Sequence, residues 1–324
     1  SSTRPSPHVN NDAWESESVA DMSDALTFID TNLGRFREEL NEFLRIPSIS
    51  AKSEYDDETS RSAEWLASRM REAGLEVEVL ATEGHPIVLG EWRGAGANAP
   101  TVLVYGHYDV QPPEPLELWT SPPFEPTERE GRIYARGSAD DKGQLYMHVK
   151  ALEAHLATSG SLPVNVVVLA EGEEEVGSRN LVPFVDAHLE RLACDVVVIS
   201  DTGMFAEGLP SILFSLRGLA YFEIHVHGAR SDLHSGEFGG SVMNPGNALS
   251  QIIASLHDDQ GRIALPGFYD NVVEWDAETR EQIAALPHSD DEFRDELDVV
   301  ALGGEESFST LERLWIRPTC DVNG

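Results

Sequence analysis

Val164-Asn-Val-Val-Val-Leu-Ala170, followed directly by Glu171-Gly-Glu-Glu-Glu175, is the stretch that decides the fold class of this 324-residue chain. Short runs rich in β-branched residues, bounded by glycine and polar clusters, are typical of buried strands in a parallel sheet. The acidic residues come at the point where this strand is expected to end. They therefore predict a site at that edge of the sheet.

Two further runs end in the same way. Thr101-Val-Leu-Val-Tyr-Gly106 leads into His107-Tyr-Asp109, and Asp195-Val-Val-Val-Ile-Ser200 leads into Asp201. Asp140 lies in a glycine-bounded turn before an expected helix. Because the carboxyl ends of parallel strands meet at one edge of a sheet, we expect these side chains to converge.

The rest of the first 211 residues alternates between helical and strand-like patterns. This alternation predicts an α/β fold with a mostly parallel sheet flanked by helices. The further expected elements are helices over 24–43, 59–73, 142–158 and 180–191 and strands over 75–80 and 87–92.

The pattern changes after Pro210. Residues 219–227 alternate and predict a strand, 244–257 predict a helix opened by an Asn-Pro cap, and 314–319 predict a further strand. These elements predict a second, α+β domain that is incomplete here, and the family resemblance described below implies that it is inserted into the first. The expected divisions are a disordered leader over 1–24, a metal-binding α/β domain over 25–211 and the α+β domain over 212–324.

The charge is strongly negative, with 57 Asp and Glu residues against 23 Lys and Arg residues and a net charge of -34. Such a field repels nucleic acid and anionic membrane surfaces, so neither is an expected partner. No apolar stretch approaches the ~20 residues that span a bilayer. Cys194 and Cys320 fall in apolar or strand-like sequence, and we expect buried free thiols and a reducing, cytoplasmic compartment.

Several of the convergent residues suit metal chemistry. His107 and Asp109 are two apart in an extended segment, so their side chains point the same way, and a metal-bound imidazole usually donates its other N–H to a carboxylate. Taken alone, His107 could be an ordinary strand-end histidine and Asp140 a helix N-cap. With four acidic residues beside one histidine, a site for Zn²⁺, or alternatively Mn²⁺ or Co²⁺, is favoured.

The acidic run Glu173-Glu174-Glu175 is unfavourable after a buried strand unless a cation is close. Its alternative is a solvated charge run. Because neighbouring side chains point differently, one glutamate could bind a metal while the next accepts a proton from water, which is the division of labour in a metal-dependent hydrolase.

At this point the sequence resembles the dinuclear zinc exopeptidases, a family that includes carnosinase-type dipeptidases, glutamate carboxypeptidase and acyl-amino-acid deacylases. The resemblance covers about residues 25–324 and is nearest to the dipeptidase branch. It rests on Gly106-His-Tyr-Asp-Val-Gln-Pro-Pro113, Trp119-Thr-Ser-Pro-Pro-Phe124, Ala135-Arg-Gly-Ser-Ala-Asp-Asp-Lys-Gly-Gln144, Glu171-Gly-Glu-Glu-Glu-Val-Gly-Ser178 and Ser200-Asp201.

The resemblance implies two metal ions and a role for each residue. His107 and Asp201 would bind one metal, Glu175 would help to bind the other, and Asp140 would bridge them, with a cis peptide to Asp141. It further implies that Glu174 is the general base, that Asp109 orients the site, and that the domain over 212–324 is a lid that mediates dimerisation. His234 in Ser231-Asp-Leu-His-Ser-Gly236 would reach into the partner's site to stabilise an oxyanion, although a polar turn would explain the same segment.

The resemblance also implies a late histidine that closes the second metal site, and this chain ends before such a residue. The expected function is metal-dependent hydrolysis of the amide bond in dipeptides or similar small amino-acid amides. The alternatives are an N-acyl amino acid deacylase and a catalytically silent metal-binding or dimerisation fragment.

The dispersed acidic residues also predict a halophilic type of surface, because salt screens the repulsion between like charges. We expect the free energy of unfolding to rise between dilute and molar KCl, measured by urea denaturation at several salt concentrations. A free energy that is constant or falls over this range would refute the prediction.

Overall fold

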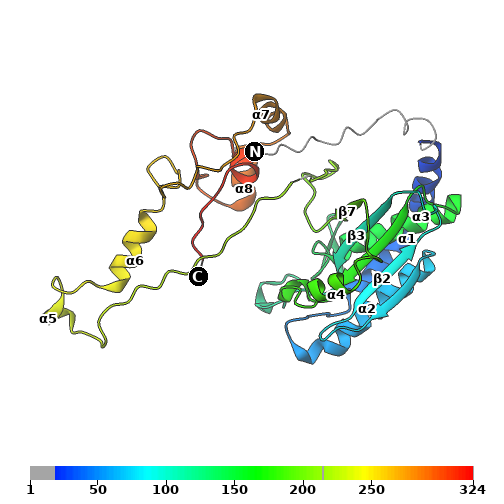
Figure 1. The fold of residues 1–324 in the computed structure, drawn as a ribbon, viewed down its shortest axis with the longest axis horizontal. Coiled ribbons are helices and arrows are strands. Elements are labelled where there is room, and N and C mark those ends of the chain that lie inside the picture. The colour runs from blue at the N-terminus through cyan, green and yellow to red at the C-terminus, as the bar shows by residue number, and fades with distance from the viewer. Residues whose placement is uncertain (1–18, 214, 324) are drawn as a thin grey trace. The chain divides into compact units, whose positions relative to one another are not determined.

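The computed structural model of the chain describes residues 19–213 and 215–323 (Figure 1). The chain divides into two compact units between Leu209 and Pro210. Residues 1–18 of the expected leader lie outside the described residues. Helix α1 spans Val19–Leu44 and so begins before the predicted start of the first domain.

The first unit is built on a five-stranded sheet with the strand order β1-β2-β6-β3-β7. Strands β6, β3 and β7 are parallel to one another, β2 is antiparallel to β6, and β1 is antiparallel to β2. The sheet is therefore mostly parallel, which confirms the predicted fold class. The strands are β1 Glu76–Leu80, β2 Ile87–Trp92, β3 Thr101–His107, β6 Asn165–Glu171 and β7 Val196–Ile199.

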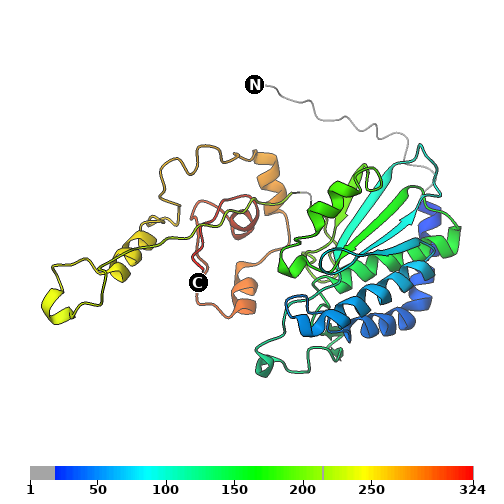
Figure 2. The ribbon, with the colours of Figure 1, turned by 60° about the horizontal axis from the view of Figure 1, so that its bottom comes forward.

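Helices cover both faces of this sheet. Figure 2 shows the blue helices α1 and α2 lying along one face, and α3 joins them there, so that Phe43, Leu66 and Leu145 share one core with Val104 and Val168. The opposite face packs Phe184 and Leu192 against a second apolar cluster on the sheet. The helices are α2 Asp56–Glu72, α3 Lys142–Ser159 and α4 Leu181–Ala187. A short hairpin, β4 Thr127–Arg129 with β5 Arg132–Tyr134, follows the proline-rich loop.

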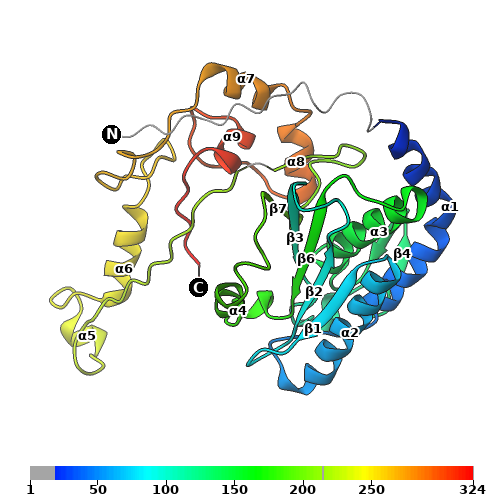
Figure 3. The same ribbon diagram turned by 45° about the vertical axis from the view of Figure 1, so that its right-hand side comes forward.

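The second unit contains helices, and no strand is assigned to it within the described residues. The α+β prediction for this part of the chain is therefore wrong for the described structure. The five helices described are α5 Ser235–Phe238, α6 Pro245–Ala254, α7 Ala277–Ala284, α8 Asp290–Leu297 and α9 Thr310–Trp315 (Figure 3).

Both predicted strands of this unit fail for identifiable reasons. Residues 219–227 have no hydrogen-bonded neighbour strand among the described residues, and Phe222 is 90% exposed. The predicted strand over 314–319 is replaced at its start by α9. Ser309 and Glu312 form a capping box that starts the helix, so local capping outweighs the apolar run.

The two cysteines are free in the described structure, but they are not buried as predicted. Cys194 is exposed and Cys320 is partly exposed. Cys194 lies just before β7, and Val196 and Val197 of that strand are themselves more than half exposed. None of the helices in the described part of the chain combines the length and apolar character that crossing a bilayer requires.

Two of the three lysines of this acidic chain are buried in the first unit. Lys150 of α3 binds Glu39 of α1 at 2.6 Å, and Arg35 binds the same carboxylate at 2.9 Å. Tyr146 donates a third hydrogen bond to Glu39 at 2.6 Å. Although burial raises the pKa of the Glu39 carboxyl, these hydrogen bonds lower it to about 2. The cluster therefore ties α1 to α3.

Substituting Glu39→Gln should lower the free energy of unfolding by about 3 kcal/mol at neutral pH, because it removes the buried anion that Lys150 and Arg35 share and leaves these two cations with Glu153 as their remaining partner. The folded-state pKa of Glu39 lies below its ordinary value of 4.5, so its contribution is present above about pH 4.5 and is lost as the pH falls toward 2. Urea denaturation of both proteins between pH 2 and 7 measures this. The exposed Glu42→Gln on the same helix is the control. A difference that does not shrink in acid would contradict the prediction.

Candidate metal centre

The parallel ladder brings the ends of three strands to one edge of the sheet. His107 is the last residue of β3 and pairs in register with Glu171, the last residue of β6. The pairing of β3 with β7 ends at Tyr105 and Ile199, two residues before Asp201. The register therefore sets the histidine, the acidic turn and Asp201 side by side.

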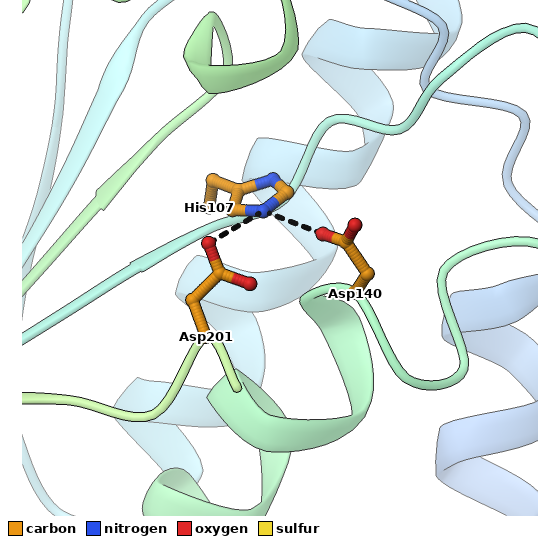
Figure 4. Close-up of side chains that lie close together, drawn as sticks. All are labelled: His107, Asp140 and Asp201. Carbon is orange, nitrogen blue, oxygen red and sulfur yellow. Dashed lines mark hydrogen bonds and ion pairs between the residues drawn. The ribbon is translucent and has the colours of Figure 1, made fainter. Parts of the chain in front are cut away.

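Three of the predicted ligands lie within reach of one cation. The Nε2 atom of His107 is 3.0 Å from Oδ1 of Asp140 and 3.8 Å from Oδ2 of Asp201 (Figure 4). One ligand atom from each residue lies within 4.8 Å of the others. His107 is fully buried, whereas the Asp140 side chain is 62% exposed. The cluster thus has a rigid inner ligand and open outer ones.

Asp140 and Asp141 are joined by the cis peptide that the resemblance implied. Asp141 occupies the N-cap position of α3, but its side chain does not cap the helix. One of its oxygens instead accepts the backbone N–H of His107 at 3.1 Å. Burial raises the pKa of Asp141 to about 7. The two neighbouring carboxylates therefore have different roles. Asp140 faces the cluster, whereas Asp141 bonds the backbone of β3.

Asp109 is fully buried and joins the histidine to the acidic turn. Its carboxylate lies 3.3 Å from Nδ1 of His107 and accepts the hydroxyl of Ser50 at 2.6 Å. The same carboxylate accepts the backbone N–H groups of Glu174 and Glu175 at 3.3 and 3.2 Å. Asp109 can therefore fix both the imidazole and the loop that carries the two glutamates.

Glu175 is set slightly apart from the three clustered ligands. Its carboxylate accepts the backbone N–H of Gln111 at 3.2 Å and the Gln111 side-chain amide at 2.8 Å. Burial raises the pKa of Glu175, the Gln111 hydrogen bond lowers it, and the charge of Asp140 raises it further. Glu175 thus interacts electrostatically with the cluster, and its carboxylate is positioned by hydrogen bonds from Gln111.

Glu174 lies in the same field of negative charge. Burial raises the pKa of its carboxyl, and the charges of Glu175 and Asp201 raise it further, whereas His107 lowers it. A carboxyl whose pKa moves toward neutrality is suited to accept and return a proton. No hydrogen bond to its carboxylate is recorded in the described part of the chain.

Glu173, the remaining glutamate of the run, stabilises the surrounding loops. Glu173 accepts the Asn180 side-chain amide at 2.7 Å and the backbone N–H of His85 at 3.4 Å. Behind it, Glu171 accepts the Tyr105 hydroxyl at 2.6 Å and the Ser178 hydroxyl at 2.9 Å. Through these hydrogen bonds, Glu171 and Glu173 stabilise the turn that follows β6.

The electrostatics of the cluster favour a cation. Burial lowers the pKa of His107, but the hydrogen bond to Asp109 and the charges of Asp109, Asp141 and Asp201 raise it to about 10. A buried imidazole would remain neutral without such surplus negative charge. A divalent cation among these oxygens would supply the positive charge directly and displace the proton.

His234 belongs to the second unit and is exposed there. Its Nδ1 accepts the backbone N–H of Gly236 at 3.0 Å, which caps the short helix α5. Within its own unit this segment is therefore a polar turn that begins a short helix, which is the alternative given for it from the sequence.

Sequence reasoning missed Gln111 and Ser50 as parts of the site. Gln111 lies two residues after Asp109, so its position in the sequence was a usable signal. Ser50 is 59 residues from Asp109 in the chain, and no local pattern marks their contact.

The chain is similar in sequence and in fold to known proteins. Residues 103–311 match the family described as Peptidase family M20/M25/M40. The chain is 33% identical over 320 residues to the Cys-Gly metallodipeptidase dug1 of Schizosaccharomyces pombe, covering 91% of this chain and 65% of that protein. It is 34% identical over 241 residues to the human Beta-Ala-His dipeptidase, covering 74% of this chain and 47% of that protein.

Among solved structures, the M20 family metallo-carboxypeptidase Sso-CP2 from Sulfolobus solfataricus is similar, with a TM-score of 0.71 and 35% identity. This similarity covers 89% of the present chain and 65% of that one. The chain thus spans about two thirds of the length of the first of these relatives.

Asp109→Asn should weaken Zn²⁺ binding by about 10- to 100-fold, because an amide cannot accept all the donors that the carboxylate now accepts. Titration calorimetry with Zn²⁺ measures the affinity. Asp186→Asn, which removes an exposed carboxylate of α4, is the charge-matched control. Equal affinities for wild type and Asp109→Asn would show that the carboxylate does not organise the site.

Proposed function

The chain belongs to the peptidase family M20/M25/M40, and from that premise we propose that it hydrolyses the amide bond of dipeptides or similar small amino-acid amides with two divalent metal ions. The observation that carries the proposal is the cluster of His107, Asp140 and Asp201, with two glutamates on the adjoining turn. The relatives named as dipeptidases support the substrate class.

The residues present fit metal ions. The imidazole of His107 and the surrounding carboxylates form the mixed nitrogen and oxygen donor set that suits Zn²⁺, with Mn²⁺ and Co²⁺ as alternatives. We propose that His107 and Asp201 bind one ion, that Glu175 helps to bind the other, and that Asp140 bridges them. Bound ions would supply Lewis acidity toward the scissile carbonyl.

The protein's own groups would carry the proton. Glu174 would accept a proton from the attacking water and return it to the leaving amine, and the raised pKa of its carboxyl suits both steps. Asp109 would hold His107 in the tautomer and orientation that ligation requires.

The second unit is proposed to act as a lid and to form a homodimer, and His234 would stabilise the oxyanion in the site of the partner subunit. The support is its exposure and its place in a compact unit separate from the sheet. We also propose a reducing, cytoplasmic location, supported by the low cysteine content of the sequence, two in 324 residues.

The dipeptidase names of the relatives favour this function over the N-acyl amino acid deacylase. Release of acetate from acetylated amino acids, without turnover of Cys-Gly or β-Ala-His, would reverse that preference. A catalytically silent module would hold about one metal ion or fewer per chain after dialysis and would cleave neither class of substrate.

Glu174→Gln should retain metal while turnover of a dipeptide falls by about 10²- to 10⁴-fold, because the amide cannot accept the proton. Metal content after dialysis and initial rates with Cys-Gly measure the two effects. Glu173→Gln changes the neighbouring acid, which is held by Asn180, and should keep most of the activity. Near-normal turnover by Glu174→Gln would remove this residue from the role of base.

Mixing two inactive variants tests the role of His234 across the dimer. His234→Ala and Glu174→Gln should each be inactive alone. After denaturation and joint refolding, heterodimers would pair an intact Glu174 with an intact His234 from the partner, restoring roughly a quarter of the wild-type sites. Sedimentation measures dimer formation in the same samples. Dimers that regain no activity would place His234 outside the partner's site.

A further inference from the structure

Asp201 follows the edge strand of the sheet. β7 spans Val196–Ile199 and pairs with β3 alone among the described strands. Its register with β3 ends at Ile199, so Ser200 and Asp201 lie beyond the ladder. A strand end of this kind is prone to fray, because hydrogen bonds reach it from one neighbour at most.

Helix α3 provides an anchor at this point. Nε2 of His148 lies 2.7 Å from the hydroxyl oxygen of Ser200, in a hydrogen bond between residues 52 apart in the chain. His148 is flanked on α3 by Leu145 and Val149, which are buried in the core. The helix is therefore held firmly, and its histidine reaches the residue next to Asp201.

The carboxylate of Asp201 makes few direct interactions that would fix its position. His107 is the one ion-pair partner recorded for it among the described residues, at 3.8 Å. Burial lowers the pKa of His148, so its ring is neutral at pH 7 and acts through a hydrogen bond rather than through charge. The position of Asp201 thus depends on the backbone at Ser200.

We propose that His148 is a positioning residue, which fixes the Asp201 carboxylate for metal binding by holding Ser200 against helix α3. The inference rests on the proposed function, in which Asp201 is a metal ligand. His148 does not touch the metal or the substrate in this role. It replaces, with one side-chain hydrogen bond, the ladder contact that the edge strand lacks beyond Ile199.

The first measurement is the affinity of the full chain for Co²⁺, by calorimetry and by the visible absorption of the bound ion. His148→Phe and Ser200→Ala should each weaken binding by about tenfold, as expected when the support of a ligand is lost. His148→Gln, whose side-chain amide can still bond the hydroxyl, should bind within about twofold of wild type. His155→Phe, two turns further along α3, is the matched control and should bind normally.

The second measurement is amide hydrogen exchange of residues 199–202 without added metal, which reports the anchoring directly. Exchange there should be faster in His148→Phe and Ser200→Ala than in wild type, with the sheet core around Val168 unchanged. Rescue by His148→Gln would separate a hydrogen-bonding role from simple packing. Unchanged exchange at 199–202, or unchanged Co²⁺ affinity in a chain that binds the ion, would overturn the inference.

The two measurements also separate this inference from the proposed function. A wild-type chain that binds no divalent metal would contradict the metal-dependent function. The exchange experiment would still decide whether His148 holds the end of β7.

Discussion

The buried carboxylate of Asp109 is the constraint on which the candidate site depends. A carboxylate removed from water is stable only when its oxygens accept hydrogen bonds or face a positive charge. Here those partners are a serine hydroxyl, two backbone N–H groups of the acidic turn and the His107 ring. The hydrogen bonds that the buried Asp109 carboxylate requires therefore fix the position of the turn after β6 relative to the end of β3.

A second level of organisation is the balance of charge inside a very acidic protein. At the sheet edge, burial and neighbouring carboxylates raise the pKa values of Glu174, Glu175 and Asp201 together, because ionised carboxylates this close repel one another unless a cation lies among them. Between α1 and α3 the opposite arrangement holds. Lys150 and Arg35 surround Glu39 and keep it ionised. The same domain thus holds acids in two kinds of environment. The carboxylates at the sheet edge have no lysine or arginine partner within the described residues, whereas Glu39 is paired with Lys150 and Arg35.

The supports of the proposed ligands differ in strength, which bears on how the site would form. His107 ends a central strand and is fully buried, so the sheet itself fixes it. Asp140 projects from a turn at the start of α3, Glu175 is held by Gln111, and Asp201 depends on the segment after an edge strand. Binding of an ion to such a set would order the outer ligands around a preformed inner one, at a smaller entropic penalty than assembling all of them.

The sequence by itself determined the α/β architecture and the identity of the convergent residues. Hydrophobic runs fix which segments become buried strands, and the parallel register then carries whatever follows those strands to a common edge. Only the tertiary structure decided that Asp141 bonds the backbone of His107, that Gln111 holds Glu175 and that His148 holds Ser200. It also decided that residues 219–227 form no strand within the described structure, despite their alternation. The physical reason is the same in each case. Periodicity reports how a segment meets the core, whereas a hydrogen bond between residues tens of positions apart, or a partner strand, exists only when packing brings both sides together.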